Sequence, residues 1–133
     1  MDPLAAGAAS MGAMTEQELL AHCLAKPGAW QDEPWEGHVV AKVGDKMFAM
    51  FGVVGERPGP AVGIKVGRSR EEADELVARY PSDVAAMAYI GRYGWNTVPI
   101  GGPVADEELR ELVDASYDDV VARLPRAKRP VTG

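Results

Sequence analysis

The chain of 133 residues has a single cysteine and no long apolar run. Because Cys23 has no partner in the sequence, an internal disulfide and a metal site built on paired cysteines are both excluded. One unpaired thiol suits a reducing compartment, so we predict a cytoplasmic protein. No apolar stretch reaches the roughly 18 residues of a membrane span. Residues 1–13 lack the basic start and the apolar core of a signal peptide, and we interpret them as a flexible leader.

Sequence motifs for catalysis are also missing. The glycine-rich pieces are not followed by the Gly-Lys-Ser/Thr of a phosphate-binding loop. His22 and His38 have no metal-ligand spacing, and Cys23 fits the apolar stripe of a helix, where cysteine behaves as a small hydrophobic residue. The carboxylates of "DEPWEG" (32–37) offer acid–base chemistry as an alternative, but this composition is more typical of a surface turn. We therefore predict no enzymatic activity, no metal and no cofactor.

Positive charge is scarce, since 14 Lys and Arg face 20 Asp and Glu and leave a net charge of −6. This balance argues against a general nucleic-acid coat protein. The distribution is uneven, however, because residues 37–70 hold six basic side chains against Asp45 and Glu56, and six minus two gives +4. The six are Lys42, Lys46, Arg57, Lys65, Arg68 and Arg70. The segment "RLPRAKRP" (123–130) is basic as well, and such patches influence binding more than the net charge does.

Three helices are predicted from capping residues and apolar spacing. The first begins with a Thr15–Glu18 capping box and ends before Pro27. The second begins with the same device at Ser69 and ends before Pro81. The third runs from about residue 106 to Pro125, with acidic residues near its positively polarised N-terminus.

Five strands are predicted between and after the first two helices. Residues 38–54 have the pattern of a hairpin around Gly44-Asp45, which would pair Val43 with Lys46, Lys42 with Met47 and Ala41 with Phe48. Strict alternation would then place Lys42, Met47 and Phe51 on one face. Further strands are expected at 61–66, within 83–90 and at 95–100. The order predicts a two-layer α+β fold, α-β(3)-α-β(2)-α, with an antiparallel sheet covered by helices on one face. It forms one domain over residues 14–125, followed by a basic tail at 126–133.

Trp95 is the most informative aromatic residue of this pattern. If Val98 and Ile100 face the helices, Trp95 points to the uncovered face together with Lys42, Lys65 and Met47. An indole flanked by lysines on an open sheet can stack a base while the cations contact phosphates. The alternative is that Trp95 is a packing anchor under a loop or a neighbouring subunit.

Five segments are informative as an ordered set: "MTEQELLAHCLAKPGAW" (14–30), "MFAMF" (47–51), "YPSDV" (80–84), "WNTV" (95–98) and "ELVDASYDDVVARLP" (111–125). Together they resemble the MmcQ/YjbR family of small bacterial proteins, which are usually described as DNA-binding. The resemblance implies a fold like that of secretion chaperones and a DNA-binding role. Before the Trp this family has an Asn-Lys pair, one further residue and a His. Here Gly91, Arg92, Tyr93 and Gly94 stand there, so the cation is kept and the Asn and His are absent.

From these observations we predict a non-enzymatic DNA-binding protein that uses the open sheet face and adjoining loops. The predicted site consists of Lys42, Lys65, Arg68, Arg92, Trp95 and Asn96. The cations would position phosphates, Trp95 would stack, and Asn96 would offer an amide edge to a base. The alternative is a protein-interaction or dimerisation module on the same face, with Met47, Phe51 and Trp95 at its centre.

Overall fold

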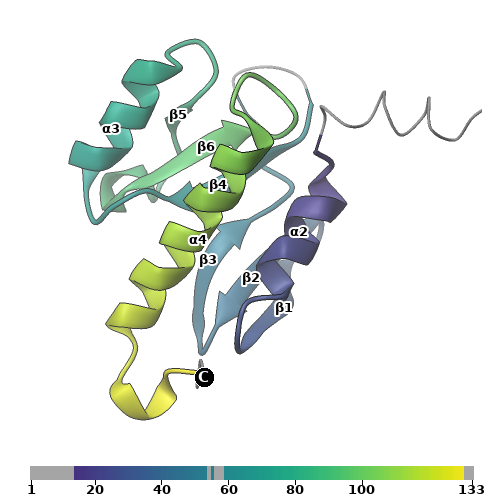
Figure 1. Ribbon diagram of the computed structural model, residues 1–133, viewed down its shortest axis with the longest axis vertical. Helices are drawn as coiled ribbons and strands as arrows, with labels where there is room; N and C mark the ends of the chain where they lie inside the picture. The colour runs from purple at the N-terminus through teal and green to yellow at the C-terminus, as the bar shows by residue number, and fades with distance from the viewer. Residues whose placement is uncertain (1–13, 54, 56–58, 131–133) are drawn as a thin grey trace, which may run out of the picture.

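A computed structural model describes residues 14–53, 55 and 59–130, so the predicted leader 1–13 lies outside the described residues. The first half of the chain forms α2 (Glu16–Leu24), β1 (Ala29–Trp35), β2 (His38–Val43), β3 (Lys46–Met50) and β4 (Ala61–Lys65). The second half forms α3 (Arg70–Arg79), β5 (Ala85–Ala86), η1 (Gly91–Tyr93), β6 (Trp95–Pro99), α4 (Asp106–Arg123) and η2 (Arg126–Lys128). The predicted two-layer α+β class is confirmed: the helices lie on one face of an antiparallel sheet, with α2 and α4 in front of it (Figure 1).

The helices begin where the capping residues predict. Thr15 Oγ1 accepts a hydrogen bond from the Glu18 N–H at 3.1 Å, and Glu18 Oε1 accepts one from the Thr15 N–H at 2.8 Å, so the predicted capping box is present. At Ser69 the hydroxyl accepts from Glu71 rather than from Glu72, at 3.5 Å. Capping hydroxyls satisfy amides that have no partner in the first turn of a helix.

The sheet has the strand order β1-β2-β3-β4-β6-β5, and each neighbouring pair is antiparallel. Strand β1 was not predicted, because Pro34 and the acidic residues around it resemble a turn. It is an edge strand, where proline is tolerated since one row of amides needs no ladder partner. The observed order is therefore α-β(4)-α-β(2)-α.

A bulge in β3 corrects the predicted hairpin. Val43 pairs with Lys46 and Lys42 with Met47 as predicted, but Ala41 pairs with Ala49, so Phe48 is the extra residue. One inserted residue reverses the alternation of every position after it. Phe51 consequently belongs to the buried core on the helix side, and its predicted place on the open face is wrong.

The hydrophobic core fills the space between the sheet and the helices. Phe48 is fully buried and contacts Tyr117 of α4 in an edge-to-face arrangement, with ring centroids 5.2 Å apart. Such pairs contribute about 0.5–1.5 kcal/mol beyond the burial of their area. Within the described residues, no helix is both long and apolar enough to cross a bilayer.

Candidate functional site

The structure buries three of the predicted site residues. Trp95 is 6% exposed, Lys65 is 7% exposed, and Asn96 is inaccessible to solvent. Strand β6 lies between β4 and β5, and the segment after β5 returns along it, so that the Met87 N–H donates to the Trp95 carbonyl at 3.0 Å. The prediction that the Trp95 indole is displayed on an open face is therefore wrong.

Asn96 has a structural contact in place of the predicted base contact. Its Nδ2 donates to the carbonyl of Ala73 in α3 at 2.8 Å, inside the protein. The amide thus ties β6 to α3, and its edge is not available to a base.

Lys42 lies apart from Trp95. Its Nζ is 2.8 Å from Asp32 Oδ2 and 5.2 Å from the centroid of the Trp30 ring, on the neighbouring strand β1. The hydrogen bond from Lys42 lowers the pKa of Asp32, which favours the charged carboxylate. A lysine already paired with a carboxylate contributes little net charge for a ligand.

Trp95 lines a hollow between β3, β4, η1 and α4, with a volume of about 390 Å³. The side chains that form it are Lys46, Met47, Lys65, Ile90, Tyr93, Trp95, Val120 and Arg123. We call it the aromatic pocket. Two of the predicted residues, Lys65 and Trp95, are therefore brought together, but in a recess.

The aromatic pocket exists because β3 and β4 diverge. They pair only through Ala49–Ile64 and Met50–Gly63. Past these pairs Ser116 of α4 replaces the missing ladder: its Oγ donates to the Phe48 carbonyl at 2.6 Å and accepts from the Lys65 N–H at 3.3 Å. A buried hydroxyl with both partners keeps the two strand ends apart without leaving polar groups unsatisfied.

Lys65 holds the loop that forms one wall of the pocket. Its Nζ donates to the carbonyls of Gly67 at 2.8 Å and Tyr93 at 2.7 Å. Burial lowers the pKa of Lys65, and the positive charge of Arg123 lowers it further, while Asp119 acts in the opposite direction. The buried Lys65 side chain therefore stabilises this wall, because its ammonium group donates hydrogen bonds to protein carbonyls.

Arg70 fastens the same loop from the other side. Its Nη1 donates to the carbonyls of Gly91 at 3.0 Å and Trp95 at 3.1 Å. Arg92 lies over the ring of Tyr93, 4.9 Å from its centroid, and both side chains are exposed. The loop therefore presents a cation and an aromatic ring at the edge of the pocket from a fixed backbone.

Asp119 of α4 lies close to three of the cations around the pocket. Its carboxylate oxygens lie 3.2 Å from Arg123 Nε, 3.7 Å from Lys65 Nζ and 3.8 Å from Arg68 Nε. One carboxylate facing three cations leaves a local excess of +2. Arg68, which is 73% exposed, extends this charge to the surface.

Further basic side chains follow α4 directly. Arg129 donates to the carbonyls of Leu124 and Ala122, which folds the tail back against the end of α4. Leu124 in turn packs close to Gly44, at the β2–β3 turn. In Figure 1 the end of α4, η2 and this turn lie together at the bottom of the molecule.

We call this region the basic end. Its cations are Lys46, Lys65, Arg68, Arg123, Arg126, Lys128 and Arg129. Against them stand Asp45, Asp118 and Asp119, and seven minus three gives +4. The rest of the sequence then has seven cations and 17 anions, or −10. Glu72, which lies against Gly67, marks the acidic border of the basic end on the side of α3.

Sequence reasoning missed the contribution of α4. Ser116, Asp119 and Arg123 are spaced i, i+3 and i+7, which places them on one helix face. That spacing was the available signal, but the predicted site used only the sheet face and the adjoining loops. The charge is in fact divided along the helix, with acid at the first turn and base at the last.

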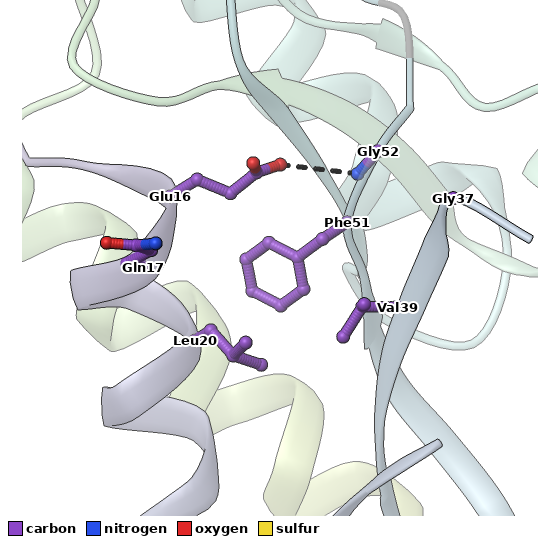
Figure 2. A pocket seen from close by; sticks show the side chains of 7 residues that line it. All are labelled: Glu16, Gln17, Leu20, Gly37, Val39, Phe51 and Gly52. Atoms are coloured by element: carbon purple, nitrogen blue, oxygen red, sulfur yellow. Dashed lines mark hydrogen bonds between the residues drawn. The ribbon is translucent and has the colours of Figure 1, made fainter. Parts of the chain in front are cut away.

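A second, smaller pocket of about 130 Å³ lies between α2 and the ends of β2 and β3. Figure 2 shows Phe51 between Leu20 and Val39, and Glu16 Oε2 accepting from the Gly52 N–H at 3.3 Å. With Phe51 and Trp95 both buried, the interaction face predicted around them does not form as expected.

The Cys23 thiol is not activated as a nucleophile. Burial raises the pKa of the Cys23 thiol to about 12, helped by the nearby Asp114. A thiol with such a pKa holds almost no thiolate at neutral pH. In the described ranges 14–53, 55 and 59–130, no three His, Cys, Asp or Glu side chains gather as a metal site would require.

The sequence is similar to a known protein family over most of its length. A family model described as YjbR matches residues 24–119. The chain is 40% identical over 118 residues to the uncharacterized protein YjbR of Escherichia coli K12, covering 87% of this chain and 95% of that protein, and equally similar to its O157:H7 counterpart.

Two crystal structures have the same fold. A Deinococcus radiodurans protein with a DUF419 domain superimposes with a TM-score of 0.76 at 26% identity, covering 89% of this chain and 87% of that one. A Pseudomonas syringae protein superimposes with a TM-score of 0.59 at 22% identity over 79% of this chain and 97% of that one. The latter supports the fold alone.

Proposed function

The chain belongs to the YjbR family, and on that premise we propose that it binds DNA by holding the phosphate backbone at its basic end. The family resemblance suggests the ligand, and the charge distribution suggests the surface. The proposal keeps the expected role and moves it from the open sheet face to the end of the molecule. It also requires the cytoplasmic location expected from the single cysteine.

The observation that supports this proposal best is the separation of charge. The basic end carries +4 while the rest of the sequence carries −10. A polyanion is therefore attracted to one end and repelled elsewhere, which orients the encounter. Contacts between basic side chains and backbone phosphates do not depend on the base sequence of the DNA.

The basic residues on and beside the pocket have different roles in the proposal. Lys46, Arg123 and Arg126 are exposed and would contact phosphates directly. Arg68 and Arg92 would extend the contact along the loop beside the pocket. Lys65 would act as a positioning residue, because both of its short hydrogen bonds go to backbone carbonyls.

A titration at two ionic strengths tests the proposal. We expect fluorescence anisotropy with labelled oligonucleotides to show binding at roughly 50 mM salt that weakens about a hundredfold at roughly 200 mM, as about four phosphate contacts require. This anisotropy measurement does not require a known DNA target sequence. Absence of binding at the lower salt concentration, or affinity that does not change with salt, would contradict the proposal.

One observation supports a protein-interaction module instead. Trp30 and Trp35 are 43% and 57% exposed, and they pair with Lys42 and His38 across the edge of the sheet. Exposed indoles are typical of interfaces. Association through them would strengthen or stay constant as salt is added, so the same titration distinguishes the two functions.

A further inference from the structure

The aromatic pocket is larger and more apolar than phosphate contacts require. Its volume of about 390 Å³ falls within the range of roughly 300–1,000 Å³ typical of small-molecule sites. Met47, Ile90 and Val120 form apolar walls, and Trp95 and Tyr93 add two aromatic rings. Cations that bind only a phosphate backbone need no such recess.

The lining of the aromatic pocket combines apolar and aromatic walls with positively charged side chains. The apolar and aromatic walls suit a flat, uncharged group, while Lys46 and Arg123 suit an anion attached to it. Asp119 disfavours a ligand whose buried part is itself negative, although Lys65, Arg68 and Arg123 offset its charge. A nucleotide has this division, with a neutral base and a charged phosphate.

We infer that the aromatic pocket accepts one unstacked nucleotide, with its base against the half-exposed Tyr93 ring and the small exposed part of Trp95, and its phosphate at Lys46 and Arg123. The inference rests on the proposed function and specifies its substrate as single-stranded nucleic acid. A base inside a duplex is stacked on both faces and cannot enter a recess without leaving the helix. Aromatic side chains stack bases with little regard to sequence.

The walls of the pocket are held in place before a ligand arrives. Lys65 and Arg70 fix the loop backbone through four hydrogen bonds to the carbonyls of Gly67, Tyr93, Gly91 and Trp95. Ser116 holds β3 and β4 apart. A preformed site avoids the entropic cost of ordering its walls on binding.

The test compares a single-stranded oligonucleotide with the duplex of the same sequence at one salt concentration. We expect the single strand to bind about tenfold more tightly, as stacking of one base implies. Met47→Trp, which fills the recess without a change of charge, and Tyr93→Ala, which removes one ring, should each bring the ratio of the two affinities close to one. Gln31→Trp, an exposed strand position on β1, adds the same ring elsewhere and should leave the ratio unchanged.

The outcomes separate the inference from the proposed function. Equal affinity for single strand and duplex, or an unchanged ratio in folded Met47→Trp and Tyr93→Ala, would overturn the inference while salt-sensitive binding still supported the function. Loss of all binding to the wild-type protein would overturn both. Competition with thymidine monophosphate tests whether the pocket prefers a free nucleotide or a nucleotide within a strand. Retention of the oligonucleotide at equal nucleotide concentration would support the strand as the ligand, whereas its displacement by the free nucleotide would overturn single-stranded nucleic acid as the substrate.

Discussion

Reversing two charges at the basic end, with Lys46→Glu and Arg126→Glu together, should weaken DNA binding at least tenfold at roughly 50 mM salt. Both side chains are exposed, and no ion pair involving either of them is seen in the described part of the chain. The two substitutions should therefore weaken contacts with DNA without destabilising the fold. Removing two phosphate contacts should also reduce the slope of log affinity against log salt by about two. Anisotropy titrations of both proteins at several salt concentrations measure these effects.

The matched control changes the net charge equally at other places. Lys42→Glu with Arg110→Glu alters the open sheet face and the first half of α4, where the cations are paired with Asp32 and Glu107. We expect this pair to change affinity less than threefold, since only long-range charge is altered. An equal loss in both double variants would mean that net charge, and not the basic end, governs binding. Circular dichroism confirms that both variants are folded.

Gly94→Ala should lower the free energy of unfolding by about 3 kcal/mol or more. Gly94 has φ of 93°, a conformation that L side chains rarely adopt, and a Cβ there would collide with the carbonyl oxygen of Gly67. The same residue turns the chain from η1 into β6, which places the Tyr93 carbonyl at Lys65. Urea denaturation with the midpoint and slope both fitted measures the change.

Gly37→Ala provides the comparison for this substitution. Gly37 has a similar φ of 81°, but an added Cβ would meet nothing within 4 Å. Its cost is therefore the backbone conformation alone, about 1 kcal/mol. If the two alanine variants were equally stable, the close packing of Gly94 against Gly67 would not be a determinant of the loop.

Local sequence signals predicted most of the elements but not the face on which every side chain lies. The Thr15–Glu18 capping box and the Gly44-Asp45 turn depend on residues a few positions apart, so they can be recognised in one sequence. The extra residue at Phe48 depends on how β3 meets β2 and β4, and no local signal marks it. Its effect was large, because Phe51 moved from the predicted open face into the core.

The candidate site was only partly predictable for the same reason. Lys65, Arg68 and Trp95 were identified as a group from their residue types, but their arrangement depends on strand order. Because β6 lies between β4 and β5, Trp95 is enclosed, and because β3 and β4 diverge, it lines a pocket. Asp119 and Arg123 join the site through the packing of α4, which residue spacing indicates only as a shared helix face.

The most direct test of a DNA-binding basic end is to map the contact by NMR. Titrating the ¹⁵N-labelled protein with a short single-stranded oligonucleotide should shift amide resonances of Lys46, Tyr93, Arg123 and residues 126–129, and the shifts should decrease as salt is added. The resonances of β1 around Trp30 and Trp35 should stay in place. Shifts confined to β1 and to Lys42, with the basic end unchanged, would contradict the account.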